Sequence, residues 1–161
     1  MITIGIDPGI AITGIGITKS TGNKIIPIYY GAIETHSKTP MPERLDQLYC
    51  GLTTLFNTYK PESMAVESLF FNKNVKTALT VGHARGIILL AGQQAGVPIF
   101  HYTPPEIKLA VCGHGRADKK QVQQMVKTIL KLSATPKPDD VADGLAIAIC
   151  HTHSYRIKSL T

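Results

Sequence analysis

The sequence predicts an α/β protein built on a mixed five-stranded sheet flanked by helices. Apolar residues alternate with small or polar ones near the N-terminus, and from position 42 onwards stretches of helical spacing alternate with short apolar runs. The chain has 161 residues, of which 43% are hydrophobic and 17% charged. This length and composition suit a single folded domain spanning residues 1–161.

Three strands are expected first. Isoleucines alternate with small residues over 2–6, and an Asp-Pro-Gly break separates them from a second isoleucine-rich segment over 12–17. A polar turn at 20–23 leads to a third expected strand over 24–33. Tight turns make these strands an antiparallel meander, so the first and third run parallel.

An amphipathic helix should follow over 42–59, because leucines recur there at helical spacing after Pro42, which suits a first helical turn. It leads to a fourth strand at 64–66. A helical crossover conserves strand direction, so the fourth strand should lie parallel to the first. Asp7 and Glu67, which follow these strands, are then expected at the same sheet edge.

The rest of the chain predicts four helices and one strand. Gly82 and Gly86 interrupt the first helical pattern, and the last helix has an apolar interior at 145–149. The expected elements are a helix over 75–95, a fifth strand over 97–102, two helices beginning near Pro105 and Asp118, and a final helix from Asp139 to about His151.

The distribution of charge favours a polyanionic partner. Lys and Arg total 17 against 11 Asp and Glu, and residues 70–137 hold ten basic residues but only the acids Glu106 and Asp118. Such a surface either binds a polyanion or simply keeps a protein in solution, and charge alone does not separate the two.

The cysteines and the apolar runs indicate a cytoplasmic protein without membrane association. Three cysteines lacking C-x-x-C spacing predict neither a disulfide framework nor a zinc finger. The N-terminus lacks a cationic leader, and the longest apolar run, near 87–91, is far shorter than the roughly 20 residues that span a bilayer.

Four acids that lie far apart in the sequence are expected to converge: Asp7, Glu67, Asp140 and Asp143. The first two end parallel strands, and the last two are three positions apart, so they project from one helix face. Carboxylates held this close cannot all stay ionised without a cation, and hard oxygen ligands select Mg²⁺ or Mn²⁺ over zinc. A cluster of this kind supports two-metal hydrolysis of a phosphodiester.

Each acid also has a purely structural interpretation. An Asp before Pro-Gly, as at Asp7, is typical of a turn, and Asp139 and Asp140 could cap the last helix. Glu67 lies in an apolar stretch, where an unpaired carboxylate is costly, so a structural ion pair would also explain it.

Seven ordered blocks of the chain resemble the RuvC family of Holliday-junction endonucleases. They are Ile4-Gly5-Ile6-Asp7-Pro8-Gly9 with Thr13-Gly14, Ala65-Val66-Glu67 with Phe70 and Asn74, Gly82 with Ala84-Arg85-Gly86, Thr103-Pro104, Ile107-Lys108, the segment from Gly113 to Val122, and Asp140-Val141-Ala142-Asp143-Gly144-Leu145-Ala146. The resemblance implies a ribonuclease-H-like fold, with Asp7, Glu67, Asp140 and Asp143 as the catalytic, metal-binding acids. Gly144 stands where alanine is frequent, which would soften the helix slightly.

The resemblance further implies an enzyme that resolves Holliday junctions by paired symmetric nicks, giving 5′-phosphate and 3′-hydroxyl ends. Asp7 would bridge two Mg²⁺ ions, for which Mn²⁺ could substitute. Lys108 and Lys119 would bind backbone phosphates, and Phe70 would stack on an unpaired base at the junction centre. A solvated helix face accounts better for other lysines, namely Lys120, Lys127 and Lys131.

Paired nicks on a two-fold symmetric junction require two sites, so a C₂ homodimer is expected. Small and aliphatic residues of the 75–95 helix suit its interface, namely Ala84, Gly86, Ile87 and Leu90. The resemblance also implies a branch-migration helicase complex as a partner and thymine-containing cleavage sequences.

Two alternatives belong to other functional classes. The N-terminal G-I-D-P-G and T-G also resemble the phosphate hairpin of actin-like ATPases, but those need two such lobes and give the D-x-x-D helix no role. A non-catalytic junction-binding protein would be expected to have lost an acid, and all four are present.

Overall fold

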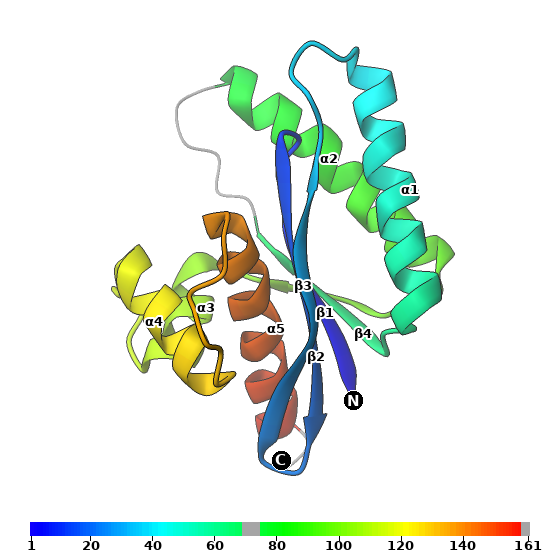
Figure 1. Ribbon diagram of the computed structural model, residues 1–161. Coiled ribbons are helices and arrows are strands. Elements are labelled where there is room, and N and C mark those ends of the chain that lie inside the picture. The colour runs from blue at the N-terminus through cyan, green and yellow to red at the C-terminus, as the bar shows by residue number, and fades with distance from the viewer. Residues whose placement is uncertain (69–74, 159–161) are drawn as a thin grey trace.

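The computed structural model describes residues 1–68 and 75–158, and it has three layers (Figure 1). Helices α1 and α2 cover one face of a central sheet, and α3, α4 and α5 lie on the other side. The strands are β1 (Ile2–Asp7), β2 (Ile12–Thr21), β3 (Lys24–Glu34), β4 (Ser63–Glu67) and β5 (Ile99–Tyr102). The helices are α1 (Met41–Tyr59), α2 (Val75–Gln94), α3 (Pro104–Cys112), α4 (Lys119–Ile129) and α5 (Asp139–Lys158).

The sheet has the strand order β3-β2-β1-β4-β5. β1 pairs antiparallel with β2, and β2 with β3, which is the expected meander. β4 pairs parallel with both β1 and β5. Ile6 is level with Val66, so the next residues, Asp7 and Glu67, end neighbouring parallel strands at one edge of the sheet.

The alternation in β1 and β2 divides isoleucines from glycines. The isoleucines are fully buried in the core that β1 and β2 form with α1 and α2: Ile4, Ile6, Ile15 and Ile17. The glycines between them face α5 on the opposite side of the sheet: Gly5, Gly14 and Gly16. Because side chains alternate along a strand, one face of these strands is bulky and the other is bare.

The bare face lets α5 lie directly on the strand backbones. A Cβ added at Gly14 would come within 1.8 Å of the backbone oxygen of Asp140, and one at Gly5 within 2.2 Å of that of Gly144. A Cβ at Gly144 would lie 2.9 Å from the backbone of Gly14. Gly144 therefore has a packing role, which its low helix propensity did not reveal.

Helix boundaries follow local capping and packing. Thr103 with Glu106 and Asp118 with Gln121 form capping boxes that begin α3 and α4 close to the expected positions. α5 continues to Lys158, beyond the predicted end near His151, because burial continues past the apolar run. The His151 ring packs against Phe100, and its Nδ1 lies 2.9 Å from the hydroxyl of Tyr102.

The helix α2 is continuous through Gly82 and Gly86, where the sequence indicated a break. Its predicted interface needs one correction: Ala84 is fully buried in the α1–α2 core, and Ile87 packs partly against that core. Ala84 is therefore not available to a partner, whereas the half-buried Ile87 keeps part of its side chain exposed. Leu90 is 48% exposed and Leu79 61% exposed.

None of the helices within the described ranges combines the length and apolar character needed to span a membrane.

Candidate active site

Asp7 and Glu67 meet at the edge of the sheet where β1 and β4 end, and their carboxyl groups share a side-chain hydrogen bond. Burial raises the pKa of Asp7 well above its ordinary value, and Glu67, Asp143 and Asp140 raise it further by charge repulsion. Burial also raises the pKa of Glu67, although the hydrogen bond with Asp7 opposes that rise. Burial and mutual repulsion thus favour a proton shared between the two carboxyl groups over two ionised ones.

The N-terminal turns of α5 bring Asp140 and Asp143 to the same place, because the glycine contacts seat this end of the helix on β2. Burial raises the pKa of Asp143, while Lys119 opposes the rise through its charge and a hydrogen bond. The structure thus places the other three acids that the sequence singled out within electrostatic range of Asp7.

Three of the four carboxyl groups have a bonding partner in this arrangement. Asp7 bonds to Glu67, whereas Asp143 pairs with Lys119 at 3.4 Å. Over residues 1–68 and 75–158, no group of three or more His, Cys, Asp or Glu side chains is arranged around a point where a metal ion could bind. Four repelling carboxyl groups with oxygen donors nevertheless make a set that a hard divalent cation fits chemically.

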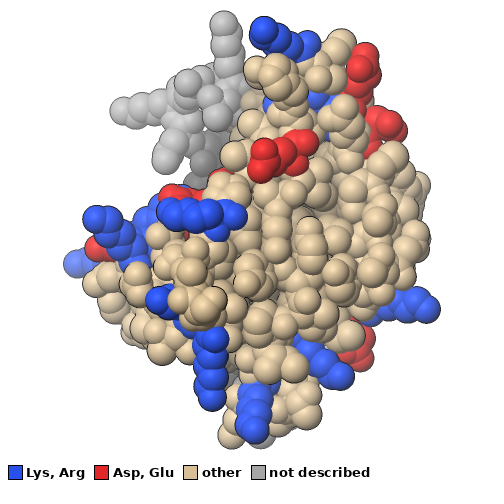
Figure 2. Space-filling view, viewed as in Figure 1, with Lys and Arg blue, Asp and Glu red and all other residues tan. Residues whose placement is uncertain are grey.

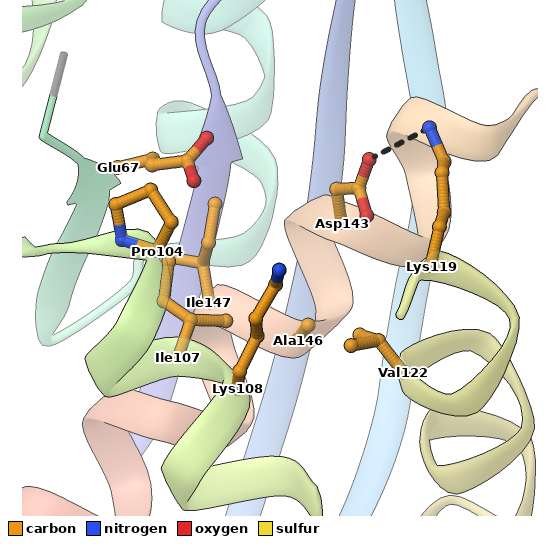
Figure 3. A pocket seen from close by; sticks show the side chains of 9 residues that line it. All are labelled: Glu67, Pro104, Ile107, Lys108, Lys119, Val122, Asp143, Ala146 and Ile147. Carbon is orange, nitrogen blue, oxygen red and sulfur yellow. Dashed lines mark ion pairs between the residues drawn. The ribbon is translucent and has the colours of Figure 1, made fainter. Parts of the chain in front are cut away.

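A pocket of about 240 Å³ opens between Glu67 and Asp143 (Figure 3). The Lys108 side chain rises from α3 and directs its ammonium group into the space between these two acids. Its charge lowers the pKa of Glu67 and partly offsets the effect of burial. Apolar side chains of α3, α4 and α5 form the floor, so the charged groups gather at the rim.

Lys119 lies on the other side of the pocket at the first position of α4. Its ammonium group pairs with Asp143 and, at 3.6 Å, with Asp139, which itself pairs with Lys137. Partial burial lowers the pKa of Lys119, but the carboxylates of Asp143 and Asp139 outweigh it, so the pKa is raised. Figure 2 shows basic side chains gathered over α4 and the start of α5, with acidic side chains among them.

Arg85 on α2 is a residue to which the sequence assigned no role. Its Nη1 donates a hydrogen bond to the backbone oxygen of Glu67, and its Nη2 lies 2.9 Å from Nδ1 of His101 on β5. The available signal was its place in the block with Gly82, Ala84 and Gly86. Phe70, expected at the junction centre, lies outside the described residues.

A sheet of this order, with carboxylates supplied by β1, β4 and α5, defines the ribonuclease-H-like class of α/β proteins. The family model described as "Crossover junction endodeoxyribonuclease RuvC" matches residues 3–151. The chain belongs to the RuvC family.

Relatives and solved structures agree with this assignment. The chain is 55% identical over 160 residues to the crossover junction endodeoxyribonuclease RuvC of Ruminiclostridium cellulolyticum, covering 99% of this chain and 96% of that protein. A solved structure of T. thermophilus RuvC in complex with Holliday junction substrate superposes with a TM-score of 0.94 at 36% identity, covering 99% of this chain and 97% of that one. The yeast mitochondrial Holliday junction resolvase shares the fold, with a TM-score of 0.69 at 16% identity and coverage of 98% and 80%.

Proposed function

We propose that this protein resolves Holliday junctions in DNA recombination and repair, as a RuvC-type endonuclease that makes paired symmetric nicks. The observation that carries the proposal is the gathering of Asp7, Glu67, Asp140 and Asp143 at one sheet edge, beside a pocket flanked by Lys108 and Lys119. Acids suited to metal binding next to cations suited to phosphate binding are what hydrolysis of a DNA phosphodiester requires.

The four acids are proposed to hold two Mg²⁺ ions, with Mn²⁺ as a substitute. Bound divalent cations supply an activated water and stabilise the departing 3′ oxygen, which leaves 5′-phosphate and 3′-hydroxyl ends. Asp7 has neighbours on both sides, with Glu67 on β4 and Asp140 and Asp143 on α5, so it suits a bridging position. Each acid must be ionised to act as a ligand, so cation binding would release the proton shared by Asp7 and Glu67.

Lys108 and Lys119 are proposed to bind the backbone phosphates next to the scissile bond. Lys108 reaches into the pocket, and Lys119 is 56% exposed, so a phosphate can approach both. Phe70 follows Glu67 by three residues, and we propose that its ring stacks on a base opened at the centre of the junction.

A C₂ homodimer is proposed to pair two such sites on one junction. The exposed face of α2 supports this arrangement, because Leu79 and Leu90 are exposed there and a Cβ at Gly82 or Gly86 would meet none of the described residues within 4 Å. No contact among the described residues requires glycine at these two positions, and small residues permit close approach of a second copy. A cytoplasmic location and a branch-migration helicase complex as partner complete the proposal.

The proposal is tested by incubating the protein with a synthetic four-way junction, a linear duplex and an RNA–DNA hybrid, each with and without Mg²⁺. Symmetric nicks in the junction alone, and only with the metal ion, are expected. Asp7→Asn and Glu67→Gln should abolish cleavage and retain junction binding, because binding rests on basic residues and hydrolysis on the acids. Junction binding without any cleavage by the wild-type protein would favour the non-catalytic alternative.

A further inference from the structure

Arg85 links three elements next to the acid cluster. Its two terminal nitrogens reach from α2 to the backbone oxygen of Glu67 on β4 and to the ring of His101 on β5. A guanidinium group is planar and its donors are fixed relative to one another. Two bonds from one such group therefore restrain the end of β4 relative to both α2 and β5.

The contact acts on the main chain of Glu67. The main causes of the shifted pKa of Glu67 are burial, Asp7, Asp143 and Lys108, and Arg85 does not belong to them. Directly after Glu67, the amide of Ser68 donates a hydrogen bond of 2.7 Å to the backbone oxygen of Tyr102. The peptide group between Glu67 and Ser68 is thus held on both sides. Arg85 binds its oxygen, and its N–H donates to Tyr102 on β5.

We propose that Arg85 is a positioning residue for Glu67. The inference rests on the proposed function, because the Glu67 carboxyl that it orients belongs to the acid cluster. A rotation of the backbone at Glu67 would swing this carboxyl away from Asp7. Displacements of about 1 Å at reacting groups cost up to about 100-fold in rate. A restraint on this peptide would therefore help to maintain the cleavage rate.

His101 forms the second arm of the contact. Burial lowers the pKa of His101, and the charge of Arg85 lowers it further, which favours the neutral ring. Because a guanidinium group can only donate, Nδ1 is the acceptor in this contact. Because this ring is exposed, its replacement should break the contact with little effect on folding stability. His101→Ala removes the acceptor, whereas His101→Asn places an amide oxygen close to the position of Nδ1.

The decisive variant is Arg85→Lys, which keeps the positive charge but cannot reach both acceptors in the same fork. Three quantities are measured: the single-turnover cleavage rate at saturating junction, the junction dissociation constant, and Mn²⁺ affinity of the DNA-free protein by electron paramagnetic resonance. We expect a rate about 10- to 100-fold lower and weaker Mn²⁺ binding, with junction affinity unchanged. His101→Ala should lower the cleavage rate and the Mn²⁺ affinity by a smaller factor, and His101→Asn should keep both close to the wild-type values.

Wild-type protein and Glu67→Gln are run alongside to separate the two proposals. Failure of the wild-type protein to cleave would remove the proposed function itself. A different result would separate the two proposals: the wild type cleaves, Glu67→Gln is inactive, and Arg85→Lys matches the wild type in rate and Mn²⁺ affinity. The proposed function would then stand, and the positioning role of Arg85 would be wrong. Loss of junction affinity with intact Mn²⁺ binding would instead make Arg85 a DNA contact. Should Arg85→Lys fail to fold, equal rates in His101→Ala and the wild type would overturn the inference.

Discussion

Asp7 is buried among three other carboxyl groups, each of which raises its pKa, so its ionised form is disfavoured in the folded protein without metal. Lys119 has the opposite relation to its surroundings, since two carboxylates favour its charged form. These residues would be unremarkable as a turn aspartate and a surface lysine in isolation. Their properties come from neighbours that the chain delivers from distant positions.

Replacing Asp7 by Asn should stabilise the metal-free protein at neutral pH. An acid whose pKa is higher when folded favours folding below its ordinary value of 3.8, and this contribution is lost as the pH rises through the folded pKa. Asparagine stays neutral throughout. Melting temperatures in EDTA from pH 4 to 8 should therefore show the advantage of Asp7→Asn over the wild type growing with pH.

Mg²⁺ provides the control for this experiment. The ion should raise the melting temperature of the wild type at neutral pH more than that of Asp7→Asn, because the mutant has lost a charged ligand. An asparagine variant that melts below the wild type in EDTA at pH 7 would show that repulsion at Asp7 does not limit stability.

Lys119 and Lys120 form a matched pair, because they are adjacent exposed lysines of which the first pairs with Asp143 at the pocket. Loss of one charge-assisted hydrogen bond to a phosphate costs about 1.5–3 kcal/mol, or roughly 10- to 100-fold. Lys119→Gln should lower junction cleavage by that factor, and Lys120→Gln should leave it nearly unchanged. Equal losses in both variants would indicate a general effect of surface charge.

At the scale of the elements, the order and direction of the strands near the N-terminus could be predicted most directly from the sequence. The meander and the parallel crossover place Asp7 beside Glu67 from strand directions alone, and the structure has that topology. The position of α5 did not follow, because the closeness of a helix to a sheet depends on which strand face it meets. Alternation of isoleucine with Gly5, Gly14 and Gly16 was visible, yet only the fold shows that the glycines all face one helix.

The Arg85 contact is a similar case. It joins residues 18 positions apart through a backbone oxygen, and a backbone group leaves no trace in residue identity. Tertiary hydrogen bonds of this kind are set by how α2 lies over the ends of β4 and β5. The end of α5 was misplaced for a related reason, since buried His151 and Thr152 continue a helix that hydrophobicity alone would stop.

Gly14→Ala tests the contact between α5 and β2. The added Cβ would lie 1.8 Å from the Asp140 backbone oxygen, so the helix must move, at a cost of about 3 kcal/mol or more. At roughly 2–4 °C per kcal/mol, thermal denaturation should show a melting temperature lower by at least about 6 °C. Cleavage by the folded protein should also fall, because Asp140 and Asp143 move with the helix.

Gly115→Ala is the control for this substitution, since its Cβ would meet its nearest neighbour at an ordinary 3.4 Å. A melting temperature close to that of the wild type is expected. If Gly14→Ala were as stable and active as Gly115→Ala, the backbone contact would not determine where α5 lies.

At the scale of the whole molecule, the acid cluster and the exposed face of α2 belong to different sides of the sheet. Leu90→Glu should weaken the proposed dimer by about ten- to a hundredfold, as expected when a charge enters an apolar interface. Ile26→Glu on β3 is the matched control, because its side chain is 52% exposed and lies on another element. Sedimentation equilibrium measures both, and a dimer insensitive to Leu90→Glu would place the interface elsewhere.

The sheet order also decides which part of the protein opens last. β1 lies in the middle, with β2 and β4 on its two sides, while β3 and β5 form the edges. Edge strands fray with little loss of buried surface, whereas amide hydrogens of a central strand exchange with solvent only when most of the fold opens. Asp7 is thus carried by the strand most protected against local opening, and fraying of β3 can proceed while this carboxyl keeps its place.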